Sequence, residues 1–140
     1  MAEIVRTADE RADAFYREHA REALKTAWAF TVVWHEQTAD LLALEGERIV
    51  GAARLRIAAS LGHVERIVVD PQFRRQGIGR RLLLELDDIA NYYNCHKMTI
   101  GVLAGGEAQR FFEACGYHQE AILPQHDFKL DVAILRKFLL

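Results

Sequence analysis

The residues that point most directly to chemistry lie in a short loop between an apolar strand and an amphipathic helix. Arg74, Gly77 and Gly79 follow the spacing Arg-x-x-Gly-x-Gly in this loop. Backbone N–H groups at the start of a helix have no partners inside it and carry a partial positive charge. Glycine lacks the Cβ atom that would keep an anion away. The helix dipole contributes only about 0.3–1 kcal/mol per anionic group, so several amides and the arginines must act together. The pattern predicts a phosphate-binding loop.

The spacing excludes the two best-known phosphate loops. There is no Gly-x-x-x-x-Gly-Lys-Ser/Thr, and no third glycine completes Gly-x-Gly-x-x-Gly. Arg-x-x-Gly-x-Gly directly after Val-Asp-Pro instead closely resembles the acetyl-CoA pyrophosphate loop of the GNAT N-acetyltransferase superfamily. The alternative is an ordinary strand-turn-helix connection with surface arginines.

This resemblance implies that acetyl-CoA is the cosubstrate. In the family, the strand before the loop binds the pantetheine arm through backbone groups, and the loop amides hold the pyrophosphate. An extended arm bearing amides can also pair with an open strand edge on general grounds, as peptides do. The resemblance assigns cofactor binding to Ile67, Val68, Val69, Arg74, Arg75, Gln76, Gly77, Ile78, Gly79 and Arg80.

A second family signature is present with two departures. It reads Gly105-x-x-Ala108-x-x-x-Phe112-x-x-x-Gly116-Tyr117, where the family has Asn at the first position and Tyr at the position of Phe112. The resemblance places Phe112 against the cofactor. The family's tyrosine commonly protonates the departing CoA thiolate, and Phe112 has no hydroxyl with which to do so.

The missing acid does not exclude catalysis. A thiol has a pKa of about 8.5, so the CoA thiolate is a fair leaving group near neutral pH. General acid catalysis contributes about 10²–10⁴-fold, and less where the proton is barely needed. An acceptor amine of pKa about 10.4 costs roughly 4.6 kcal/mol to deprotonate at pH 7. A base for the amine, or its desolvation, should therefore matter more than the acid.

The candidate bases are Glu65 and His63, two residues apart on the strand before the loop. They share a face with Ile67 and Val69 if no bulge intervenes. Family enzymes often carry a glutamate on this strand that acts through water. A glutamate of pKa near 4.3 is an ionised acceptor, whereas a histidine near 6.5 is better matched to neutral pH. Glu65 is the first candidate and His63 its partner or substitute; both could also be ordinary polar residues at a strand end.

Hydrophobic periodicity predicts the elements that position these residues. A short strand is expected at 4–6, and a helix over 9–27 that Thr7 or Asp9 caps. Residues 28–40 read as strand or helix. The remaining predictions are a hairpin of 41–44 with 49–57, strands 63–69, 97–103, 117–123 and 128–134, and helices 77–93 and 107–115, with Pro71 and Pro124 at turns.

This order predicts an α/β chain with a mixed sheet and helices on its faces, in one domain over 1–140. It matches the GNAT fold, an acyl-CoA N-acyltransferase fold, over nearly the whole chain. In the family, the segment after the first helix shapes the acceptor pocket. Trp28, Phe30 and Trp34 are therefore the candidate acceptor-site aromatics, although isolated aromatics are more often core residues.

Composition limits the partners. A chain of 140 residues with 51% hydrophobic residues can build one core, and its net charge of -2 gives no basic field for nucleic acid. We find no signal peptide in 1–6 and no transmembrane-length run. The two cysteines lack metal-ligand spacing. We therefore expect a cytoplasmic protein with reduced thiols and without metal, nucleic-acid or membrane partners.

The predicted function is acetyl transfer from acetyl-CoA to an unidentified primary amine by direct attack. Gly105 and Phe112 motivate an alternative, a catalytically weak CoA-binding regulatory module. A third reading is an interaction protein that binds no CoA, against which the intact loop argues. Family members often form a homodimer through their late strands. The apolar residues that suit such a surface, or equally the core, are Phe128, Leu130, Val132, Ile134, Phe138 and Leu139.

Overall fold

The computed structural model describes residues 1–27 and 35–139. The chain divides into two units, residues 1–34 and residues 35–140, which are described separately. The described part of the first unit, residues 1–27, contains one helix, α1 (Arg11–Ala27). The elements of the second unit are β1 (Glu36–Glu45), β2 (Arg48–Ala58), β3 (Leu61–Val69), the 3₁₀ turn η1 (Pro71–Phe73), α2 (Ile78–Tyr92), β4 (Lys97–Leu103), α3 (Glu107–Ala114), β5 (His118–Asp127) and β6 (Leu130–Phe138).

In the first unit, the helix prediction is confirmed and the strand prediction at 4–6 is wrong. The backbone N–H of Arg11 donates to Asp9 Oδ1 at 3.0 Å, so Asp9 supplies the expected cap. Residues 1–8 have no regular structure, and Ile4 and Val5 are exposed. Three residues without a pairing strand cannot hold an extended conformation, which explains the error. Trp28, Phe30 and Trp34 lie outside the described residues.

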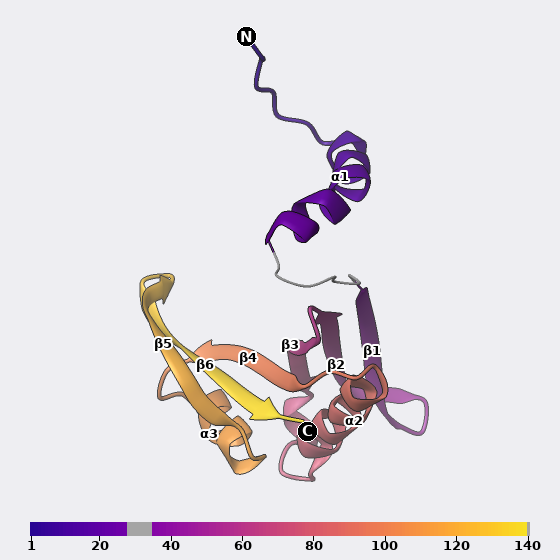
Figure 1. Ribbon diagram of the computed structural model, residues 1–140. Helices are drawn as coiled ribbons and strands as arrows, with labels where there is room; N and C mark the ends of the chain where they lie inside the picture. Colours follow the sequence, from indigo (N-terminus) through magenta and orange to yellow (C-terminus); the bar gives the residue numbers. More distant parts are fainter. Residues whose placement is uncertain (28–34, 140) are drawn as a thin grey trace. The chain divides into compact units, whose positions relative to one another are not determined.

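The second unit is built on a six-stranded sheet with the order β1-β2-β3-β4-β6-β5 (Figure 1). Only β3 and β4 run parallel, and every other neighbouring pair is antiparallel. The expected mixed sheet is confirmed. The β1–β2 hairpin turns through Gly46, whose φ of +61° suits glycine.

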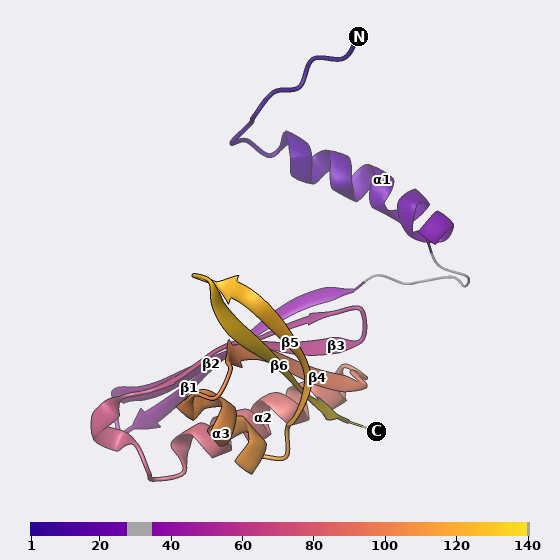
Figure 2. The ribbon, with the colours of Figure 1, turned by 90° about the vertical axis from the view of Figure 1, so that its left-hand side faces the viewer.

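Both helices of this unit pack on the same face of the sheet (Figure 2). α2 covers β1, β2 and β3, whereas α3 covers β4, β5 and β6. One continuous core lies between the helices and the sheet, and its fully buried side chains include Leu55, Val64, Leu83, Leu86, Met98, Phe112, Tyr117 and Leu135. Among residues 1–27 and 35–139, none of the helices has the length and apolar character needed to cross a membrane.

The turn predicted at Pro124 is wrong, because this residue lies inside β5. Pairing between β5 and β6 is irregular between Leu123 and Asp127. An edge strand tolerates proline at such an irregularity, since no neighbour needs its missing N–H. The chain turns instead at Phe128 and Lys129, with φ of +50° and +65°, so β6 starts later than predicted.

The late apolar residues divide between core and surface. Val132 and Leu139 are buried, whereas Phe128, Leu130 and Phe138 are exposed. The homodimer through these residues stays a prediction, for which the three exposed side chains are available.

Two leucines of α2 provide a matched test of the core. Leu86 is 0% exposed and Leu84 is 50% exposed. Leu86→Ala should lower the free energy of unfolding by about 2–5 kcal/mol, because it leaves a cavity. Leu84→Ala should change it by about 0.5 kcal/mol or less. Urea unfolding followed by circular dichroism measures both, and equal losses would contradict this account of the core.

Candidate functional site

The site begins where β3 and β4 separate. The two strands pair only from Leu61–His63 to Lys97–Thr99. β4 then continues along β6 as far as Leu103, while β3 runs on to Val69 beside β2 alone. The edge of β3 that faces β4 therefore has backbone groups without a strand partner. Such an edge can hydrogen-bond an extended ligand.

A β-bulge lies directly after the last parallel pair. Arg54 pairs with Arg66 and Leu55 pairs with Val64, so Glu65 is the extra residue of β3. A bulge bends its strand and increases the local twist, which accounts for the separation at this point. The bulge also reverses the alternation of side chains along β3.

This reversal corrects the predicted face of the candidate bases. Ile67 and Val69 pack against the core beneath the sheet. His63 precedes the bulge, beside the buried Val64, so its side chain lies on the opposite face. Glu65 contacts Arg56, which also lies on that opposite face. The two candidate bases are together, but they do not share a face with Ile67 and Val69.

A groove of about 560 Å³ runs from the unpaired part of β3 to the starts of α2 and α3. It brings together all the predicted cofactor-binding residues except Gln76, namely Ile67, Val68, Val69, Arg74, Arg75, Gly77, Ile78, Gly79, Arg80 and Phe112. Sequence reasoning missed four further lining residues, Phe73, Glu107, Ala108 and Phe111. Phe73 directly precedes Arg74, so an aromatic side chain at this position could have been predicted to line the groove.

The start of α2 presents free backbone donors to this groove. Gly77 precedes the helix with φ of +79° and supplies no side-chain cap. The first helical hydrogen bond runs from the N–H of Arg81 to the carbonyl of Gly77, so the three preceding amides have no helical partner. A Cβ added to Gly79 would lie 3.3 Å from the Phe111 ring. Gly79 is therefore packed against Phe111, whereas a Cβ added to Gly77 would meet no atom within 4 Å.

The arginines of the groove add to this positive potential. In the described parts of the chain, Arg74, Arg75 and Arg80 form no ion pair with a carboxylate. Unpaired guanidinium groups beside free helical N–H groups suit a doubly charged pyrophosphate. The donor set thus fits the diphosphate of CoA.

Arg48 holds the turn that precedes the loop. Its Nη2 donates to Asp70 Oδ2 and Gln72 Oε1, each at 3.2 Å. Its guanidinium also lies 4.9 Å from the centre of the Phe73 ring. Asp70 in turn accepts the N–H of Gln72 at 2.9 Å. These contacts fix the path of the chain between β3 and α2.

Phe112 closes the floor of the groove and leaves it without a tyrosine hydroxyl. Its ring is 1% exposed and packs edge-on against Phe111 and Tyr117. The nearby Tyr117 is also buried, and its hydroxyl donates to Asp87 Oδ1 at 3.4 Å. Burial and the Asp87 charge raise the pKa of Tyr117 far above its usual value. Tyr117 therefore does not replace the missing acid.

His63 and Glu65 differ in what they contact. His63 Nδ1 lies 2.9 Å from Thr99 Oγ1, its partner in the parallel register. Burial, and then the charge of Arg56, lower the pKa of His63. Glu65 Oε1 lies 3.3 Å from Arg56 Nε. His63 is thus neutral near pH 7, whereas Glu65 is engaged in an ion pair.

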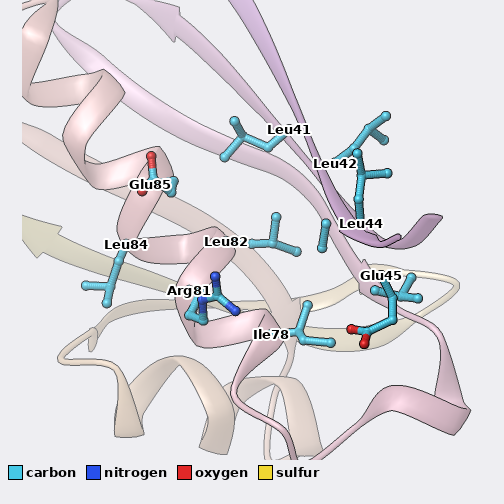
Figure 3. Close-up of a pocket in the computed structure, with 11 residues that line it drawn as sticks. Leu41, Leu42, Leu44, Glu45, Ile78, Arg81, Leu82, Leu84 and Glu85 are labelled. Atoms are coloured by element: carbon cyan, nitrogen blue, oxygen red, sulfur yellow. The ribbon is translucent and has the colours of Figure 1, made fainter. Parts of the chain in front are cut away.

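A second groove, of about 340 Å³, lies between β1 and α2 (Figure 3). Leu41, Leu42 and Leu44 from β1 and Leu82 and Leu84 from α2 line it. Arg81, Glu85 and Glu45 are its charged residues. Neither candidate base lines this second groove or the groove beside β3, but the groove beside β3 starts at Ile67, two residues after Glu65.

The cysteines take no part in the site. Cys95 is buried and Cys115 is half-buried, and burial raises the pKa of both thiols. A thiol with a raised pKa is a poor nucleophile. In the described ranges, no three His, Cys, Asp or Glu side chains gather closely enough to hold a metal ion.

Comparisons with known proteins agree with this geometry. A glucosamine 6-phosphate N-acetyltransferase of Trypanosoma brucei brucei is 32% identical over 77 residues, which are 50% of this chain and 51% of that protein. The chain thus spans about half the length of this curated relative.

Solved structures share the fold at low sequence identity. An acetyltransferase from Bacillus cereus has a TM-score of 0.78 at 17% identity, with 98% of each chain covered. A GNAT family acetyltransferase from Elizabethkingia anophelis with acetyl-CoA bound has a TM-score of 0.68 at 20% identity, covering 73% of this chain and 76% of that one.

The family follows from a longer match. The family described as acetyltransferase (GNAT) domain matches residues 5–125, which is most of the chain. The loop and the separated strands β3 and β4 lie within this range, whereas β6 lies beyond its end. The chain therefore belongs to the GNAT acetyltransferase family.

Proposed function

We propose that this protein transfers the acetyl group of acetyl-CoA to a primary amine. The observation that carries the proposal is the groove itself, in which free helical amides, unpaired arginines and an open strand edge meet. A diphosphate and an extended amide-bearing arm are the two parts of CoA that such groups bind. The family and the neighbour with acetyl-CoA bound support the same cosubstrate.

Each part of acetyl-CoA has a proposed place. The loop amides from Arg75 to Gly79, including that of Gln76, hold the pyrophosphate together with Arg74 and Arg80. The pantetheine arm pairs with the backbone of 67–69. The thioester then lies toward the bulge, beside Glu65 and His63. An amine arriving there attacks the carbonyl directly and displaces the CoA thiolate.

We propose His63 as the base that takes the proton from the amine, with Glu65 as the second candidate. Nδ1 is engaged with Thr99, and Nε2 has no hydrogen-bond partner among the described residues. No buried polar side-chain atom of that part of the chain lacks a partner, so Nε2 reaches solvent. If Nδ1–H donates to Thr99 Oγ1, the lone pair of Nε2 is free to accept a proton.

We also propose an acceptor amine, a cellular location and an oligomeric state. The curated relative is named for glucosamine 6-phosphate, and this amine is the first candidate acceptor. Unpaired cysteines suit a reducing compartment, which supports a cytoplasmic location. The exposed Phe128, Leu130 and Phe138 support a homodimer through β5 and β6.

The second candidate function is a CoA-binding regulatory module with weak catalysis. Phe112, in place of the family's tyrosine, favours it. A turnover assay separates the two candidates. We expect release of free CoA thiol when acetyl-CoA and a panel of amines that includes glucosamine 6-phosphate are supplied. Tight acetyl-CoA binding without release of thiol for any amine would favour the regulatory module.

Charge reversal in the loop tests the cosubstrate site. Arg74→Glu with Gly77→Glu should weaken acetyl-CoA binding at least 100-fold, because it places two carboxylates against a diphosphate and forces a side chain into a left-handed conformation. Lys129→Glu, at the distant β5–β6 turn, is the charge control. Calorimetric titration measures the affinity, and circular dichroism checks the fold. Unchanged affinity in the double variant would overturn the site.

The pH profile of turnover tests the base. The pKa of His63 lies below its usual value of about 6.5, so kcat should rise with pH through an acid limb below about pH 6.5. His63→Asn keeps a polar atom near Nδ1 and removes Nε2. It should lower kcat about 10²–10⁴-fold and abolish this limb without changing the Kd for acetyl-CoA. Loss of the limb in Glu65→Gln, with its retention in His63→Asn, would assign the base to Glu65.

A further inference from the structure

We infer that Arg66, supported by Arg54, forms a subsite for an anionic group on the acceptor amine. The register places Asp40, Arg54 and Arg66 in one row across β1, β2 and β3. Arg54 alternates with the buried Ala53 and Leu55, so this row lies on the face opposite α2. It is the same face that carries His63 and Glu65.

The charges of this face are not balanced. Asp40 pairs with Arg54, at 2.7 Å from Oδ1 to Nε and 3.4 Å from Oδ2 to Nη2. Glu65 pairs with Arg56 in the next row. Arg66 has no hydrogen bond or ion pair in the part of the chain that the structure describes, although it lies directly opposite Arg54.

Two like charges directly opposite each other across antiparallel strands destabilise the sheet. Asp40 offsets the charge of Arg54, but no carboxylate among the described residues pairs with Arg66. An arrangement that is unfavourable for folding and lies beside a candidate active site is expected where a ligand supplies the missing charge.

The location of Arg66 matches the path of the acceptor. Arg66 directly follows the bulged Glu65, past the last residue of β3 that pairs with β4. It therefore lies directly before Ile67, the first residue of β3 that lines the groove. An amine that approaches a thioester beside Glu65 would bring its other end near Arg66.

The chemistry of the guanidinium group defines the ligand. Its planar set of N–H donors matches the oxygens of a phosphate or a carboxylate, which it binds in a bidentate manner. Asp40 already occupies one edge of Arg54, which leaves Arg66 as the principal donor and Arg54 as a supporting charge. The acceptor class is thus an amine with a phosphate or carboxylate group. This inference rests on the proposed function, because the subsite serves an acceptor only if the groove holds acetyl-CoA.

A binding experiment tests the subsite without turnover. The protein is first saturated with CoA, so that the loop arginines are occupied, and is then titrated calorimetrically with inorganic phosphate or with acetate. Wild type should bind one or both anions, and Arg66→Gln should bind at least tenfold more weakly. Arg66→Lys should be intermediate, because it keeps the charge and loses the planar donors. Lys129→Gln controls for the loss of one positive charge.

The stability of the variant separates recognition from structure. Arg66→Gln should be as stable to urea as the wild type or more stable, because it removes a like-charge pair. Equal anion binding by wild type and Arg66→Gln, or no anion binding by the CoA-saturated wild type, would overturn the subsite. Failure of the wild type to bind CoA at all would instead overturn the proposed function.

Turnover with matched amines distinguishes the two anions. Glucosamine and glucosamine 6-phosphate differ by a phosphate, and ethanolamine and β-alanine compare a hydroxyl with a carboxylate. The anionic member of at least one pair should have the higher kcat/KM, and Arg66→Gln should remove that preference through KM. An equal preference in wild type and variant would contradict the assignment.

Discussion

The early separation of β3 from β4 is the constraint on which the rest of the site depends. Parallel pairing stops after His63 and Thr99, and β4 continues with β6 instead. The sheet therefore opens in its middle, where the edge of β3 can pair with a ligand. The same opening leads directly to the start of α2, because β3 ends in the loop that precedes this helix. A strand edge and a helix N-terminus, where backbone groups lack partners, therefore line the same groove.

The bulge at Glu65 decides which side chains lie on each face of β3 beside this opening. One extra residue bends β3 and turns the side chains that follow it to the other face. Ile67 and Val69 can then pack on the core, while their backbone remains available beside the groove. His63, Glu65 and Arg66 gather on the opposite face, where an acceptor can reach them. In the proposed mechanism, the cosubstrate binds along the edge of this strand and the acceptor approaches the face that carries His63 and Glu65.

Local patterns predicted most of the fold and much of the groove. The residue types of the loop, above all Gly77 and Gly79, were sufficient to predict its conformation. The strand predicted at 97–103 has the bounds that its apolar run indicated. The bulge could not be predicted, because one extra residue changes pairing with a distant strand and leaves no local signature. The strand at 4–6 failed because short apolar runs are ambiguous without a partner. The position of Arg66 opposite Arg54 could not be predicted either, because it depends on the strand register that the bulge sets.

The central claim is that acetyl-CoA lies along β3 and the start of α2. Nuclear magnetic resonance of the ¹⁵N-labelled protein during an acetyl-CoA titration tests it most directly, since each backbone amide reports separately. The account predicts the largest amide shifts at residues 67–69 and 75–80, with little change at 41–44. Shifts centred on the second groove at 41–44 and 82–85, or no shifts at all, would contradict it.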